Sequence, residues 1–507
     1  MSKFFGAVEL LWYTFVYRKS RQAAADALSA SGLVSFACEK PPMPQPRVSL
    51  VIAAAALVVG CATVSDREPL NSVERALDLP EGWQRLDAAG EIDPAWLGSF
   101  SDPALEAFTG RVLANNAELG AERQRLQQAR EQLSVTRAAR WPTFALSLAT
   151  FRRDPEPIQF NDRFTLTLDV AWQADILGEL STANRAAALR LASAEARYLD
   201  VRRRIVADTA RAWYGLAAAR DLEGVFEQRV ENATAALDVV ERGYRSGINE
   251  ALDVYLSRSA VEAEIAALAE QRQLAVEAAA TLQALVVDYP DGDLAETPSL
   301  AIPPVTPAAG VPGALITRRA DLQQSWLDLL AADADAAVAH KQRFPRLVFT
   351  GDAQGVGPTV GEAIDTDPLN WRIFTSLTQP LFEGGRLRAA ERSALARAAE
   401  LEQVWLGNVV GAFAEVENGL SRSRTLDQRF AATNQSRIAA DAALELALDQ
   451  YARGIINFAT VLETQQRAFD ARAAEVRLAE ARLRNRIDLY QALGGPFGPT
   501  DTMEARR

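Results

Sequence analysis

The sequence has few of the residues that most often carry catalytic or redox chemistry. Its 507 residues include one histidine, His340, and two cysteines, Cys38 and Cys61. If the chain is cut before Cys61, as argued below, no second thiol remains to form a disulfide. A single histidine leaves little for a metal centre, and we expect His340 to be a solvated helix residue. We therefore expect no enzyme activity, no metal and no cofactor, and the net charge of −12 argues against a nucleic-acid partner.

The sequence also lacks an apolar run long enough to cross a bilayer as a helix, which takes about 20 residues. The run from Val48 to Gly60 follows Arg47, and this arrangement is typical of a secretory signal peptide. A signal core belongs near the start of translation, so we interpret residues 43–60 as the signal peptide and residues 1–42 as an upstream extension created by gene calling.

The apolar run ends in Leu-Val-Val-Gly-Cys, at Cys61. This ending resembles the lipobox of bacterial lipoproteins, in which the chain is cut before the cysteine and the thiol is acylated. The resemblance implies a covalent lipid on Cys61, and Ala62 after it suits delivery to the outer membrane. An ordinary signal peptide with a chance cysteine is the alternative.

The rest of the sequence contains an internal repeat. RWPTF at Arg140 returns as RFPRL at Arg343, and YRSGIN at Tyr244 returns as YARGII at Tyr451, each roughly 200 residues later. A proline-rich stretch lies between the two copies. We therefore divide the chain into an N-terminal lipidated segment (61–95), a first repeat (96–289), a linker (290–312), a second repeat (313–495) and a C-terminal tail (496–507).

Each repeat is expected to contain a very long helix. No proline occurs in 158–289 or in 381–495, and apolar residues recur there at steps of three and four. The pattern predicts helices over 181–244 and 386–451, each on the order of 100 Å long. Each repeat then reads as a helix, two strands, a long helix, a glycine turn and another helix.

Strict alternation of apolar and polar residues marks the strands. The clearest segment is 163–173, and 143–150, 346–354 and 371–379 show weaker forms of the pattern. About ten alternating residues are typical of an outer-membrane barrel strand, although a soluble hairpin looks similar. The expected lipid face is Phe164, Leu166, Leu168, Val170 and Trp172; the expected lumen face is Thr165, Thr167, Asp169 and Gln173.

Four strands cannot close a barrel in one chain, because known barrels begin at about eight strands and open sheet edges are not tolerated in lipid. Several copies must share one barrel. Two copies would supply about eight strands, which side chains fill, whereas about twelve strands from three copies would leave a conduit. The sequence therefore favours the larger assembly.

Four segments carry a family resemblance: WLGSFSDPAL at Trp96, VPGALITRRADL at Val311, QPLFEGGR at Gln379 and, more loosely, DILGE at Asp175. With the repeat, they resemble the TolC-like outer membrane factors, in particular the lipoprotein branch of tripartite efflux systems. The resemblance implies a mainly α fold with a transmembrane β part. It implies a homotrimer with a shared twelve-stranded β-barrel and a long α-helical coiled-coil barrel.

The same resemblance implies a function. The chain would be a passive duct in the outer membrane that exports small molecules such as drugs. Its partners would be a periplasmic adaptor, an inner-membrane transporter and outer-membrane lipid. The alternatives are an outer-membrane duct for type I protein secretion and a coiled-coil lipoprotein scaffold without a pore.

The two glycine turns would form the periplasmic tip of the duct, because glycine allows the left-handed angles that a reversal between helices needs. Relatives often carry an acidic residue just after the second tip glycine, but this chain has Ile455 there. Glu250 and Asp253 are then the nearby candidates for an acidic pore constriction. The resemblance assigns adaptor binding to Tyr244, Gly247, Val254, Tyr451, Gly454, Val461 and Leu462.

Overall fold

The computed structural model describes residues 73, 79–80, 82–84, 96–153, 161–247, 249–296, 298–300, 309–365 and 370–495. The chain divides into two compact units after Ala62, and no residue of the first unit is among those described. All elements described belong to the second unit. The predictions for the signal peptide, for the lipid on Cys61 and for the tail 496–507 lie outside the described residues.

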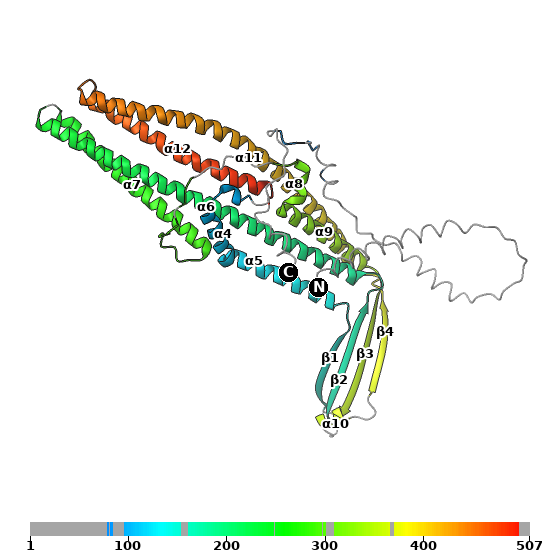
Figure 1. Cartoon of the computed structure of the whole chain (residues 1–507). Helices are drawn as coiled ribbons and strands as arrows, with labels where there is room; N and C mark the ends of the chain where they lie inside the picture. Colours follow the sequence, from blue (N-terminus) through cyan, green and yellow to red (C-terminus); the bar gives the residue numbers. More distant parts are fainter. Residues whose placement is uncertain are drawn as a thin grey trace, which may run out of the picture. The chain divides into compact units, whose positions relative to one another are not determined.

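Nearly the same order of elements occurs twice along the chain, with one extra short helix, α10, in the second set (Figure 1). After the short 3-10 helix η1 (Gly98–Phe100), the first set is α4 (Pro103–Asn115), α5 (Ala117–Ala138), β1 (Thr143–Arg153), β2 (Asn161–Ala174), α6 (Glu179–Arg245) and α7 (Ala251–Val286). The second set is α8 (Pro312–Arg318), α9 (Ala320–Lys341), β3 (Arg346–Gly357), α10 (Val360–Ile364), β4 (Asn370–Thr378), α11 (Arg386–Ala452) and α12 (Phe458–Ala492).

The two long helices, α6 and α11, confirm the predicted mainly helical fold. Each contains 67 residues, about 100 Å at 1.5 Å per residue. Both begin after a glycine with left-handed backbone angles, Gly178 at φ 72° and Gly385 at φ 86°. Among the described residues, no helix combines the length and apolar character that a membrane span requires.

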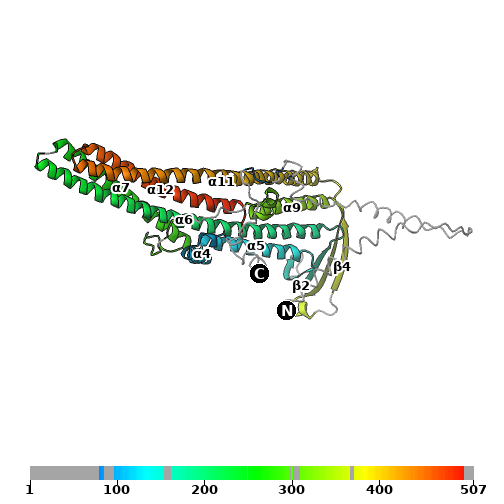
Figure 2. The same ribbon diagram turned by 45° about the horizontal axis from the view of Figure 1, so that its top comes forward.

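Helical hairpins bury the core. α6 packs against α7 and α11 against α12, and α6 also contacts α5, α9 and α12 (Figure 2). Trp213 of α6 is fully buried, and its Nε1 donates to Asp102 at 2.9 Å. Trp405 of α11 is fully buried against Trp326 of α9, with ring centroids 4.7 Å apart. Each long helix therefore has one tryptophan at the centre of a core cluster.

The residue before α5 and the residue before α9 each form a hydrogen bond to the last helix of the same repeat. Asn116, before α5, donates through Nδ2 to the Leu285 carbonyl at 3.0 Å. Arg319, before α9, donates through Nη1 to the Ala492 carbonyl at 3.2 Å. The two pairs occupy matching places, because α5 and α9 have the same length and each acceptor lies at the end of the last helix of its repeat.

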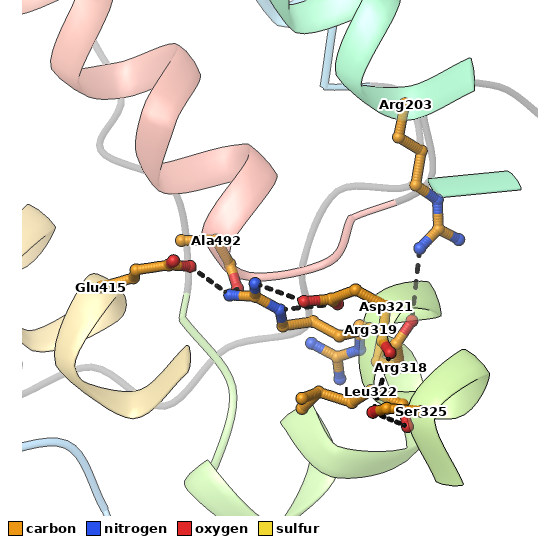
Figure 3. A network of polar contacts seen from close by, with 8 residues as sticks. All are labelled: Arg203, Arg318, Arg319, Asp321, Leu322, Ser325, Glu415 and Ala492. Atoms are coloured by element: carbon orange, nitrogen blue, oxygen red, sulfur yellow. Dashed lines mark hydrogen bonds and ion pairs between the residues drawn. The ribbon is translucent and has the colours of Figure 1, made fainter. Parts of the chain in front are cut away.

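Arg319 also gathers carboxylates around it (Figure 3). Its Nε and Nη2 donate to the two oxygens of Asp321, at 3.0 and 2.8 Å, and Nη1 donates to Glu415 at 2.5 Å. Burial by itself would lower the pKa of Arg319, but the hydrogen bonds and negative charge of Asp321 and Glu415 outweigh burial and hold the pKa above its usual value. This cluster joins α9, α11 and α12.

The four strands form one antiparallel sheet in the order β1-β2-β3-β4, which confirms the predicted four strands (Figure 1). Thr143 pairs with Ala171 in the first hairpin, and Arg346 pairs with Thr378 in the second. These pairs take equivalent places in the two repeats. The short helix α10 lies between β3 and β4.

Candidate functional site

One face of the sheet is apolar and uncovered. The register places Leu146 opposite Leu168, and Leu168 opposite Ala353, so these side chains share a face. Several side chains on this face are largely exposed, with Leu146 at 71% and Trp371 at 70%, and a contiguous exposed apolar patch is unusual on a soluble monomer. The predicted lipid-facing residues all lie on this face: Phe164, Leu166, Leu168, Val170 and Trp172.

The opposite face is mainly polar. Asp169 of β2 lies opposite Asp352 of β3, which lies opposite Arg372 of β4. Asp352 and Arg372 form an ion pair at 3.1 Å that the sequence analysis did not single out, although both residues belong to predicted strands. The predicted lumen-facing residues lie on this face: Thr165, Thr167, Asp169 and Gln173. The alternation is imperfect in β4, where Phe374 is on the polar face.

The sheet ends in two open edges. β1 pairs on one side with β2, β4 pairs on one side with β3, and no other strand of the described residues pairs with either. Water can hydrogen-bond to the unpaired backbone N–H and C=O groups of an open edge. In hydrocarbon, each unpaired group costs a free energy of roughly several kcal/mol. The open edges therefore have to be paired wherever the sheet lies in hydrocarbon.

The helix pairs reverse at two glycines with left-handed backbone angles. Gly247 has φ 76° and Gly454 has φ 73°. Each amide donates to the carbonyl of the tyrosine three residues earlier, Tyr244 at 3.0 Å and Tyr451 at 2.9 Å. Nothing lies within 4 Å of a Cβ built on either glycine, so the backbone angle and not space requires glycine.

The two tips form one small core. Val240, Val254, Phe458 and Val461 are buried together, and Asn249 of the first tip donates to the Tyr451 hydroxyl of the second at 3.3 Å. Of the residues expected to meet an adaptor, Val254 is 8% exposed and Val461 is 1% exposed. Tyr451 and Leu462 are partly buried against the same core. These side chains hold the tips together within the chain.

A different set of apolar side chains lies on the surface of the tips. Tyr244 is 51% exposed and Ile455, just after the second tip glycine, is 64% exposed. Leu252, Tyr255 and Leu256 follow the first tip and are about half exposed or more. Their spacing of three and four places them on one side of α7, opposite to the side that carries Val254 and the buried Ser257. The sequence analysis missed them because a helical stripe of this kind does not say which side is covered.

The two candidate constriction residues act as a helix cap. Glu250 accepts from the backbone of Asp253, and the Asp253 side chain accepts from the Glu250 amide at 3.3 Å, which together form a capping box at the start of α7. The second tip uses Asn457 instead, whose Oδ1 accepts from the Thr460 amide at 3.0 Å. Both carboxylates thus have a local structural task at the tip.

His340 is not a solvated helix residue. Its Nδ1 lies 2.7 Å from Glu391 of α11, and Arg343 donates to the other oxygen of Glu391 at 2.6 Å. Burial alone would raise the pKa of Glu391, but the hydrogen bonds from His340 and Arg343 outweigh it and hold that pKa below its usual value. The expectation failed because the partner is 51 residues away in sequence. Among the described residues, no cluster of side chains fits a metal ion.

Comparisons with known proteins agree with this geometry. The sequence profile of the outer membrane efflux protein family matches residues 109–286 and 311–495. The pyoverdine export outer membrane protein OpmQ of Pseudomonas aeruginosa is 29% identical, over 88% of this chain and 96% of that protein. The probable efflux pump outer membrane protein TtgC of Pseudomonas putida is 25% identical, over 88% of this chain and 95% of that protein.

Solved structures share the fold. The outer membrane protein VceC of Vibrio cholerae superposes with a TM-score of 0.74 at 24% identity, covering 80% of this chain and all of that one. The outer-membrane channel OprN gives a TM-score of 0.75 at 22% identity, covering 83% of this chain and 99% of that one. Since the family profile covers both halves of the chain, this protein belongs to the outer membrane efflux protein family.

Proposed function

We propose that three copies of this chain close their sheets into one barrel and form an outer-membrane duct for small molecules. One observation carries the proposal: a four-stranded sheet has an uncovered apolar face, a polar opposite face and two open edges. Closure by copies of the same chain pairs every edge and turns the apolar face toward lipid. The polar face, with Asp169 and Asp352, would then line the lumen.

The internal repeat supplies the expected register between copies. Within the chain, Val170 of β2 lies opposite Gly351 of β3. The equivalent positions in the other repeat are Leu377 of β4 and Leu148 of β1, because the two hairpins have matching registers. Leu377 of one copy should therefore lie opposite Leu148 of the next.

The helices support the same arrangement. Within the chain, the long helix of the first repeat, α6, is covered by two helices of the second repeat, α9 and α12. The equivalent contacts of the second repeat would cover α11 with α5 and α7 of the next copy. α11 has an apolar side ready for such a cover, in which Leu395, Val410 and Leu446 are each about half exposed.

The duct would carry out no chemical step. An adaptor protein in the periplasm would bind the tip surface of Tyr244, Leu252, Tyr255, Leu256 and Ile455, and an inner-membrane pump would supply the energy. The acidic balance of the chain favours cationic cargo over anionic cargo. Among the relatives, OpmQ is named for pyoverdine export and TtgC as an efflux pump component, which supports small organic molecules as cargo. Acylation at Cys61 would add a membrane anchor.

The test is export in the host cell after replacing the gene with a Gly454→Pro variant. Proline cannot adopt φ 73° and has no N–H for the bond to Tyr451, so the second tip must change while the distant sheet is untouched. We expect a normal trimer and a loss of export. Gly411→Ala is the control and should export normally, because Gly411 is exposed, has open space around it and lies in α11, the helix that precedes the Gly454 turn.

The alternatives give other results. A type I secretion duct would leave small-molecule resistance unchanged on gene deletion and stop the release of a protein substrate. A scaffold without a pore would give no ionic conductance in planar bilayers under any condition. Normal export by Gly454→Pro would contradict the assignment of the tip as the working end.

A further inference from the structure

A pocket lies where α5 runs into β1. It has a volume of about 570 Å³ and is lined by Arg137, Arg140, Trp141, Pro142, Trp172 and Asn184. Trp141 is 73% exposed, and Trp172 donates from Nε1 to the Arg140 carbonyl at 3.0 Å. The pocket therefore combines two cationic side chains with two tryptophans at the helix end of the sheet.

The two arginines have no counter-ion in the described part of the chain. Both side chains are exposed, and neither Arg137 nor Arg140 takes part in an ion pair there. Asn184, the polar side chain beside them, has a buried Oδ1 without a hydrogen-bond partner. Other arginines of the chain do have a carboxylate partner, such as Arg229 with Glu264 at 2.8 Å.

The equivalent place in the second repeat contains a carboxylate that the first repeat lacks. His340, Arg343 and Glu391 occupy the places that Arg137, Arg140 and Asn184 occupy in the first repeat, because α9 corresponds to α5 and α11 to α6. In the second repeat, Glu391 accepts hydrogen bonds from His340 and Arg343 and balances them.

In the first repeat, the same place has two arginines and an amide in place of the carboxylate. The Glu391 carboxylate of the second repeat thus has no charged equivalent in the first repeat.

We propose that this pocket binds the phosphate headgroup of an anionic phospholipid, which supplies the negative charge that Glu391 supplies in the second repeat. Two guanidinium groups match phosphate oxygens well, because each presents a planar fork of donors. Trp172 lies on the apolar face of the sheet, beside Phe349 at a ring distance of 5.5 Å. The acyl chains would continue along that face, which distinguishes a lipid from free phosphate.

This inference rests on the proposed function, since the apolar face contacts lipid only in a membrane-embedded barrel. Tryptophan and arginine together at a barrel rim suit the boundary between headgroups and hydrocarbon. The pocket would anchor each copy at the membrane surface next to the helices.

The experiment is native mass spectrometry of the purified trimer, titrated with phosphatidylglycerol or phosphatidylcholine. We expect one tightly held phosphatidylglycerol per chain. The double variant Arg137→Gln, Arg140→Gln should weaken its binding at least about tenfold, because two charge-assisted contacts are lost. Asn184→Glu should weaken it similarly, because it rebuilds the internal anion of the second repeat and keeps the arginines.

Arg123→Gln is the matched control, because Arg123 is exposed on the same helix, about 21 Å from Arg137. It should bind phosphatidylglycerol as the unmodified chain does. Equal binding by all variants would overturn the proposal, and so would equal affinity for the two lipids. Inorganic phosphate should compete only weakly; full competition at equal concentration would show a simple anion site and overturn the lipid assignment.

Failure of the duct and failure of the lipid pocket give different results. If the unmodified chain forms no trimer and exports nothing, the proposed function fails. If it forms an exporting trimer whose lipid binding ignores these substitutions, only the pocket proposal fails.

Discussion

The helices α6 and α11 have equal lengths and matching places in the two repeats, yet they bury very different numbers of side chains. Of 67 residues in each, 20 are buried in α6 and 9 in α11. Six large apolar residues of α11 are exposed, against two of α6. α6 has neighbours on several sides within its own chain, whereas the main neighbours of α11 are α9 and α12. This difference supports the proposed assembly, in which another copy covers the second repeat.

Substitutions on the buried sides of α6 and α11 should nevertheless reduce stability by similar amounts. Trp213 of α6 and Trp405 of α11 are each fully buried. Trp213→Ala and Trp405→Ala should each lower the free energy of unfolding by about 3–5 kcal/mol, because each leaves a large cavity. Chemical unfolding in detergent, followed by circular dichroism, measures this. A loss below about 1 kcal/mol at either site would contradict the burial described for that helix.

The connections at the starts of the two repeats should differ in strength. Arg319→Ala leaves Asp321 and Glu415 without their shared cation, so we expect a loss of about 2–3 kcal/mol. Asn116→Ala removes a neutral helix cap and the hydrogen bond to the Leu285 carbonyl. We expect it to lower the free energy of unfolding by about 1 kcal/mol. The same unfolding measurement compares them. Equal losses would show that the charges around Arg319 add nothing.

The outer side of α11 should matter for assembly and little for the single chain. Leu446→Glu places a charge on a side chain that is 57% exposed in one copy. We expect the stability of the monomer to change by less than about 0.5 kcal/mol, while the trimer fraction in size-exclusion chromatography falls strongly. Leu446→Met, which keeps the apolar area, should assemble normally. An intact trimer in the Leu446→Glu protein would remove this side of α11 from the interface.

The smallest expected effect is the pH dependence that Glu391 contributes, for which Asn184 offers no equivalent in the first repeat. The folded-state pKa of Glu391 lies below its unfolded value, so its stabilising contribution is present above about pH 4.5 and is lost as pH falls through the lowered pKa. Glu391→Gln should flatten the loss of stability in that acidic window. Unfolding midpoints measured between pH 3 and 6, roughly, test this. The Asn184→Gln protein is the control, since the first repeat has no carboxylate there.

The features that depend on sequence period were predictable. Apolar residues at steps of three and four, without proline, indicated α6 and α11, and alternation indicated β2 and its faces. The tip glycines, Gly247 and Gly454, were predictable because a reversal between helices needs left-handed backbone angles, which glycine adopts easily.

Features that depend on which side of an element is covered were not predictable. Val254 and Tyr255 are neighbours in sequence, but only the packing of Val254 against Phe458 and Val461 shows that the first is buried. The pairing of His340 with Glu391 required two helices to be placed side by side. The contrast between Glu391 and Asn184 then required the two repeats to be compared in three dimensions.

The most direct measurement of sheet closure is a disulfide between copies in the membrane. The chain has cysteines only at 38 and 61, so Leu148→Cys with Leu377→Cys introduces a well-defined pair. Residues directly opposite in antiparallel strands lie about 4.5–5.5 Å apart, within the reach of a disulfide. Leu146→Cys with Leu377→Cys is the matched control, two residues out of register on the same face.

We predict a covalently closed trimer on a non-reducing gel for the Leu148 and Leu377 pair, and little cross-linking for the control. Only monomers with both pairs, or equal cross-linking with both, would contradict closure of the sheet by neighbouring copies in this register.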